Sequence, residues 1–249
     1  MIALFFATAA DAGDTCIDPP YVKVYSAEET ELRNVYLEIA PVLDRFPSLG
    51  EALTEMAPQL CFSSKMDNAH GYLDVDDNRI VLSEELSSAM RIAVLLHELR
   101  HLEQLALGIC PSDNLAMGEY ARATFALEAD ASAISLLVAW DMKEHGDDSA
   151  WVALSVWPSQ NDIARRFEEE MAKSGDAAAA TAFAFDQWHA SGARRELYYL
   201  ASCSDYLDRQ DAGHTLPRYQ LVPDDFFEQL CRMPDGGSYH CSIPYTDPR

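Results

Sequence analysis

Apolar side chains recur every three or four positions in the first part of the chain, which is the spacing of one helix face. Residues 26–29 (SAEE) have the Ser-x-x-Glu form of a capping box, which satisfies free backbone N–H groups at the start of a helix. The apolar positions that follow are Leu32, Val35, Tyr36 and Ile39. We therefore expect a helix that continues to the region of Pro41 and Pro47, and a second helix over residues 49–57.

The pattern changes after Pro58, where short β-rich runs replace the helical spacing. These runs are LCFSS (residues 60–64), GYLDV (71–75) and RIVLS (79–83). Asp76, Asp77 and Asn78 separate the last two runs, and residues of this kind suit a tight hairpin turn. The sequence therefore predicts a small sheet in this region.

Helical spacing returns at Ser87 and dominates the rest of the chain. It predicts one helix over residues 87–108, another over about 115–144 that ends at Gly146, and further helices to about residue 209. The chain after Gly213 reads as irregular structure held by cysteines. Since no repeat or linker divides the sequence, we expect one predominantly helical α+β domain over residues 13–249, with the small sheet next to the 87–108 helix.

The composition suits a folded protein with a large acidic excess. The chain has 249 residues, of which 49% are hydrophobic, so it can fill a substantial core. Its 18 basic and 41 acidic residues give a net charge of -23, which repels nucleic acid and anionic membranes. No stretch reads as long and apolar enough to span a bilayer. We therefore expect neither a nucleic-acid partner nor a membrane span.

Six cysteines and the N-terminal residues bear on the compartment. The cysteines are even in number and none lies in a CxxC pair, so disulfides are their simplest use. Cys231 and Cys241 flank a Pro-Asp-Gly-Gly turn signal, and we expect this pair to be bonded. Residues 1–12 resemble a signal segment that lacks a basic start. These features favour a periplasmic or extracellular protein over a cytoplasmic one.

The segment LLHELRH, residues 95–101, carries the clearest chemical pattern in the chain. His97 and His101 are four residues apart, so on a helix both imidazoles project from one face and can bind one ion. Glu98 lies beside them and can act as a general base toward water. The surrounding apolar residues cover most of the helix, so it should be buried: Ile92, Leu95, Leu96, Leu99 and Leu102. Two buried histidines and a glutamate need partners, and a metal ion supplies them.

A third ligand has to come from another segment, and the next helix offers two glutamates. Glu119 and Glu128 are nine residues apart, which turns them about 180° from each other on a helix, so only one can face the metal. Glu119 has Arg122 within reach, whereas Glu128 is surrounded mostly by small residues that allow a close helix approach. We choose Glu128 as the third ligand, with Asp130 as a weaker substitute.

Other candidate residues are less informative. Asp74, Asp76, Asn78 and Glu85 occupy positions of a calcium loop, but Arg79 stands where such a loop needs glycine, so a solvated hairpin turn explains them better. Five residues are of a type that could stabilise an oxyanion, and the sequence does not choose among them: His189, Tyr198, Tyr199, His214 and His240. His70 and Tyr72 lie near the expected edge strand and are candidates for the lining of a cleft.

Taken with the segments RIVLS and LEADASA on either side, the HELRH motif resembles the gluzincin branch of zinc metallopeptidases, especially ImmA/IrrE-type domains and related bacterial metallopeptidases. The resemblance covers roughly residues 71–137. It implies a zincin-like fold, zinc on His97, His101 and Glu128, and a sheet edge that pairs with an extended substrate. Arg100 stands where a small glycine is usual, and Ser132 where many gluzincins carry aspartate.

We therefore expect a zinc-dependent peptidase with one Zn²⁺ per chain, a peptide or protein substrate, and Glu98 as general base. The alternative is a non-catalytic binding or regulatory module that retains the fold and a structural metal. A structural site would not require Glu98, which favours the enzyme. The sequence predicts neither the substrate nor the oligomeric state.

Overall fold

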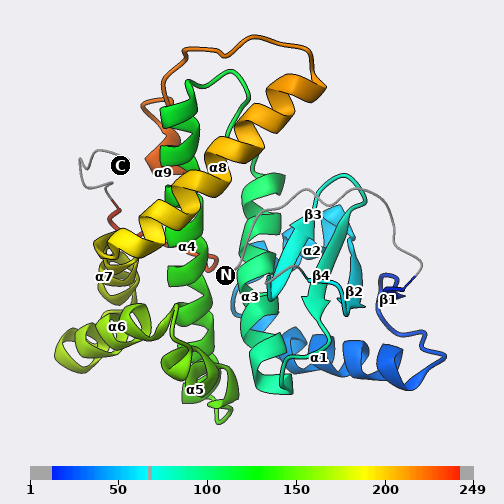
Figure 1. The fold of residues 1–249 in the computed structure, drawn as a ribbon. Helices are drawn as coiled ribbons and strands as arrows, with labels where there is room; N and C mark the ends of the chain where they lie inside the picture. Colours follow the sequence, from blue (N-terminus) through cyan, green and yellow to red (C-terminus); the bar gives the residue numbers. More distant parts are fainter. Residues whose placement is uncertain (1–12, 67–68, 242–249) are drawn as a thin grey trace. The chain divides into compact units, whose positions relative to one another are not determined.

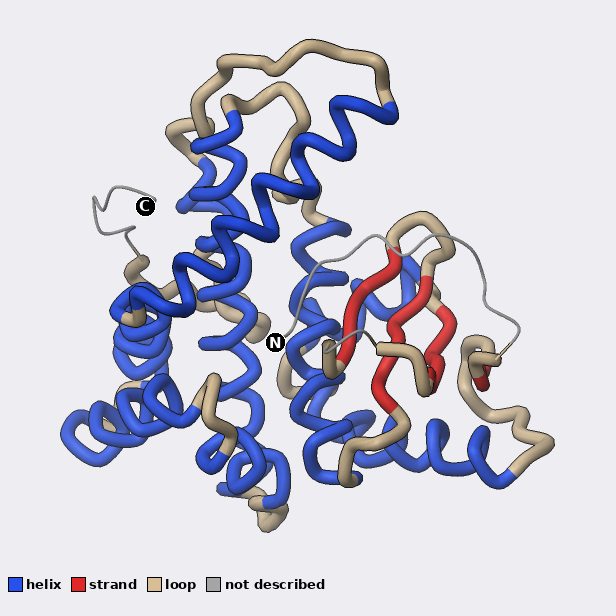
Figure 2. The backbone as a smooth tube through the Cα atoms, in the orientation of Figure 1, coloured by secondary structure: helices blue, strands red, loops and turns tan. Residues whose placement is uncertain are grey.

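The computed structural model describes residues 13–66 and 69–241. Within these residues the chain is mostly helical and contains one small mixed sheet, as the colouring in Figure 2 shows. This confirms the predicted α+β class. The signal-like segment over residues 1–12 lies outside the described residues.

The chain divides into two compact units. The first contains Met1–Ala106 and Ser135–Trp157, and the second contains Leu107–Ile134 and Pro158–Arg249. The single domain expected over residues 13–249 stays a prediction.

The sheet of the first unit has four strands in the order β1-β2-β4-β3. The strands are β1 (Thr15–Ile17), β2 (Gln59–Ser63), β3 (Gly71–Asp74) and β4 (Arg79–Ser83). β2 and β4 run parallel, and the outer strands pair antiparallel to them. The three predicted strands are confirmed, with Asn78 at φ 50° in the predicted turn. β1 was not predicted, because three residues are too few to show alternation.

The helices of the first unit include α1 (Ala27–Leu43), α2 (Pro47–Met56), α3 (Ser88–Ala106) and α5 (Ser149–Val156). α1 packs against β1 and β2 of the sheet. α1 begins where the capping box predicts, since the Ser26 hydroxyl accepts a hydrogen bond from the Glu29 backbone N–H at 3.0 Å. α3 packs against β3 and β4, and also against α2 and α5 (Figure 1).

The second unit is built mainly from helices. α4 (Met117–Glu144) contributes its residues up to 134, followed by α6 (Asn161–Ser174), α7 (Ala177–Ala190), α8 (Gly192–Ala212) and α9 (Phe226–Leu230). The alanine-rich segment forms α7 and packs against α6 and α8. α4 is long and apolar enough to cross a membrane by length and composition, contrary to our reading of the sequence. Its most apolar window is 89% buried, as expected for a core helix of a soluble protein.

Two disulfides are present. Cys231–Cys241 confirms the predicted pair, and Cys16–Cys61 joins β1 to β2 at directly opposed positions. Cys110 and Cys203 carry no disulfide, so disulfides account for four of the six cysteines. The fold therefore uses one disulfide to fasten each terminal region.

Candidate metal centre

α3 presents the HELRH residues from a fully buried stretch of helix. Side chains from Ile92 to Gln104 are buried on every face, because the helix packs against strands and helices around its circumference. His97, Glu98 and His101 are each exposed by no more than 2%. Burial of three ionisable side chains in one helix turn is costly unless they have partners, so this turn has the character of a site rather than of ordinary core.

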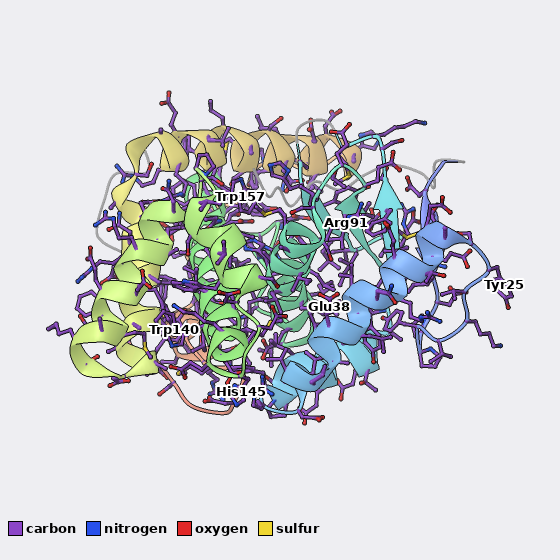
Figure 3. The ribbon with its side chains drawn as sticks, turned by 90° about the horizontal axis from the view of Figure 1, so that it is seen from below. Tyr25, Glu38, Arg91, Trp140, His145 and Trp157 are labelled. Carbon is purple, nitrogen blue, oxygen red and sulfur yellow. A yellow bond between two sulfur atoms is a disulfide. The ribbon has the colours of Figure 1, made fainter. Side chains whose placement is uncertain are left out.

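Arg91 and the close approach of Gly71 hold α3 against α1 and the sheet. Arg91, labelled in Figure 3, forms an ion pair with Glu31 of α1 at 2.8 Å and lies 4.2 Å from the ring centroid of Phe62 in β2. Gly71 at the start of β3 lies so close to α3 that a Cβ atom there would be 2.4 Å from Cγ1 of Val94. Val94 is one helical turn before Glu98, so the glycine allows the sheet to reach the helix beside the motif.

The two imidazoles of α3 point at each other through their Nε2 atoms. The Nε2 atoms of His97 and His101 are 2.9 Å apart, and the ring centroids are 4.6 Å apart. The Nδ1 atom of His101 is turned away and lies 2.8 Å from Oε1 of Gln104. Both histidines thus direct the same nitrogen to one point. Gln104 was not among the residues predicted for the site, although its i+3 spacing from His101 places it on the same helix face.

Glu128 on α4 contributes a buried carboxylate. One ligand atom from each of His97, His101 and Glu128 lies within 4.8 Å of the other two, and all three residues are buried. Two imidazole nitrogens and one carboxylate oxygen form a donor set that suits zinc in a site with an open position. The chemistry of these three side chains therefore fits a metal ion.

The two competing carboxylates of α4 have other partners. Glu119 pairs with Arg122 at 2.8 Å, as its sequence spacing suggested, and also accepts a hydrogen bond from the backbone N–H of Val222 at 3.2 Å. Asp130 is fully buried and accepts a hydrogen bond from the Tyr239 hydroxyl at 2.6 Å. Both carboxylates therefore have structural contacts within the second unit.

The calcium-loop candidates form a hairpin with an internal ion pair. Arg79 at the start of β4 lies 2.7 Å from the buried carboxylate of Asp74 at the end of β3, and it also pairs with Asp77 at 3.1 Å. An arginine in the centre of the carboxylates occupies the place that a cation would take. The hairpin interpretation of this segment is confirmed.

The residues of suitable type for oxyanion stabilisation differ in their surroundings. His189 is buried against Phe185 and Trp188, and burial together with Arg195 and Arg194 lowers its pKa to about 4. Tyr198 lies 5.2 Å from the Trp188 ring centroid. Tyr199 is partly exposed, whereas His214 and His240 are exposed.

The two residues expected near the edge strand have different surroundings. His70 packs on Trp157 with ring centroids 5.0 Å apart, and burial lowers its pKa. Side chains alternate along a strand, so Tyr72 faces away from the side on which Gly71 meets Val94 of α3. Burial raises the pKa of the Tyr72 phenol, and the negative charge of nearby Asp14 raises it further. Tyr72 is thus on the sheet face opposite the HELRH helix.

Comparison with known proteins gives one family. The model of the family described as "Putative metallopeptidase family (DUF6782)" matches residues 8–241, which is nearly the whole chain. No curated protein and no solved structure matches the chain.

Proposed function

Because the chain belongs to the Putative metallopeptidase family (DUF6782), we propose that it hydrolyses peptide bonds with one zinc ion held by His97, His101 and Glu128. The family implies a metal ion and a hydrolase. The observation that carries the proposal further is the convergence of two Nε2 atoms, 2.9 Å apart, on a helix that also carries Glu98. The third donor is the buried carboxylate of Glu128.

Zinc is the proposed metal because of the donor types. Neutral imidazoles and one carboxylate are common ligands of catalytic zinc, whereas calcium and magnesium prefer oxygen ligands alone. A zinc ion bound there supplies a Lewis acid that polarises a carbonyl oxygen and makes water acidic enough to lose a proton near neutral pH. The absence of any cysteine from the donor set favours a catalytic site over a structural one.

Glu98 is the proposed general base. It follows His97 directly in α3 and is 1% exposed, so bulk water does not compete for its carboxylate. In the proposed reaction its carboxylate accepts a proton from the attacking water and then delivers that proton to the nitrogen of the leaving amine. A structural metal site would not need a carboxylate at this position.

The proposed substrate is an extended peptide that pairs with the edge of the sheet. β3 pairs with β4 on one side, and the strand order of the described residues places no strand on its other side. The same strand packs against α3, which carries the motif. A peptide added to such an edge forms main-chain hydrogen bonds that do not depend on its sequence. This arrangement, with a glutamate ligand after HELRH, supports the zincin-like fold, the gluzincin type and the ImmA/IrrE resemblance.

Two disulfides support a periplasmic or extracellular location, because disulfides are rare in reducing cytosol. Fractionation of the producing cells, with blocking of free thiols before lysis, tests this assignment. Disulfide-linked protein in the periplasm or medium is expected, and fully reduced protein in the cytoplasm would contradict it.

Metal content tests the proposed site. The purified full chain should contain about one zinc per molecule by elemental analysis, whereas His97→Ala and His101→Ala should lose the metal and melt at lower temperature. A matched control is His145→Ala, which removes a histidine that contacts Asp141 on the exposed end of α4. Full zinc occupancy in both ligand variants would refute the site.

A further inference from the structure

Gln104 is a buried polar side chain in the last turns of α3 and has no role in the reaction described above. It is 0% exposed, and its Oε1 atom lies 2.8 Å from Nδ1 of His101. The residue follows His101 by three positions, so both side chains lie on one face of the helix. Burial of an amide costs free energy unless the amide forms hydrogen bonds, so the folded protein favours the hydrogen bond between Gln104 and His101.

The contact determines which nitrogen of His101 carries the proton. An amide oxygen only accepts hydrogen bonds, so a neutral His101 that faces it must carry its proton on Nδ1. The lone pair is then on Nε2, which is the atom 2.9 Å from Nε2 of His97. If the amide were turned to present its NH₂ group, Nδ1 would have to accept and the proton would move to Nε2. That tautomer could not bind a metal through Nε2.

We infer that Gln104 is a positioning residue that holds His101 in the Nδ1–H tautomer and fixes its ring orientation for metal binding. The inference rests on the proposed function, since it assigns a role toward the proposed zinc ion. Partners that orient ligating histidines in this way usually contribute 10- to 100-fold in metal affinity, and they raise the basicity of the ligating nitrogen. Residue 104 must therefore supply an acceptor oxygen to Nδ1 of His101, and only a side chain as long as Gln or Glu places one there.

Three variants separate this role from simple core packing. Gln104→Met keeps an unbranched side chain of similar length but removes the acceptor. Gln104→Glu keeps an oxygen at the same reach, and Gln104→Asn keeps the amide but shortens it. The matched control is Gln210→Met, because Gln210 is also buried in a helix, donates to the Asp113 carbonyl at 3.0 Å and accepts from the Thr215 hydroxyl at 2.5 Å.

Zinc affinity measured by competition with a chromophoric chelator on the full chain tests the inference, with circular dichroism as the check of folding. We expect Gln104→Met and Gln104→Asn to bind zinc about 10- to 100-fold more weakly than wild type. Gln104→Glu should bind zinc at least as tightly as wild type. Gln210→Met should lower the melting temperature without changing the zinc affinity.

The outcomes distinguish this inference from the proposed function. If wild type binds zinc and Gln104→Met binds it equally well, the positioning role is refuted and the metal site is not. Equal weakening in the Glu and Met variants would likewise refute it, since packing rather than an acceptor would then matter. If wild type binds no zinc, the proposed function and this inference are both overturned.

Discussion

Replacing Gly71 by alanine should destabilise the first unit by forcing the sheet away from α3. A Cβ atom at residue 71 would lie 2.4 Å from Cγ1 of Val94, 3.1 Å from the Val81 carbonyl oxygen and 3.3 Å from Cδ2 of Leu82. Val94 is fully buried, so its methyl group has no free space to enter. Overpacking of this kind costs about 1–3 kcal/mol. For a chain of this size about 2 kcal/mol corresponds to a melting temperature lower by about 4–8 °C.

Thermal unfolding followed by circular dichroism measures the effect. Gly118→Ala is the control, because its added Cβ would have no atom within 4 Å. The double variant Gly71→Ala with Val94→Ala removes the clashing methyl group. The double variant should therefore lose less free energy of unfolding than the two single variants lose together, by about 0.5–3 kcal/mol. Wild-type stability in Gly71→Ala, or additive losses in the double variant, would refute the close approach of β3 to α3.

Three further predictions concern other parts of the chain. Glu128→Gln should weaken zinc binding, whereas Glu119→Gln should leave it unchanged; release of zinc by the second variant in elemental analysis would reverse the ligand assignment. The pKa of His189 is lowered from its usual 6.5 to about 4, so the folded state resists its protonation. Stability should therefore fall by up to about 3 kcal/mol as the pH drops from about 6.5 to 4, and denaturation of His189→Leu should lack this slope. Thiol titration of the denatured, unreduced protein should find two reactive cysteines, Cys110 and Cys203, and six would exclude both disulfides.

The parts of the fold that depend on local patterns could be predicted from the sequence. The capping box placed the start of α1, because its hydrogen bond joins residues three apart. Helical spacing placed α3 and brought His97 and His101 to one face. The turn residues between β3 and β4 indicated a hairpin, and the Arg79–Asp74 pair within it is also local.

Features that depend on distant neighbours could not be predicted in this way. β1 has three residues, and it is defined by pairing with β2 and by a disulfide to Cys61, 45 residues further along the chain. The need for glycine at residue 71 arises from Val94, which approaches only after the sheet packs on α3. Gln104 is an intermediate case: its spacing from His101 is visible in the sequence, but the orientation of its amide is not.

Peptide hydrolysis by zinc-loaded Glu98→Gln tests the central claim most directly. Glutamine keeps nearly the same volume, so the variant should fold and retain its zinc, but it lacks the proton acceptor. The assay uses unfolded protein or a peptide library, with chelator and zinc-restored controls and with Glu119→Gln as the matched variant. The account predicts cleavage by wild type and a rate lower by about 10²- to 10⁴-fold in Glu98→Gln at equal zinc content. Equal rates in wild type and Glu98→Gln would contradict it.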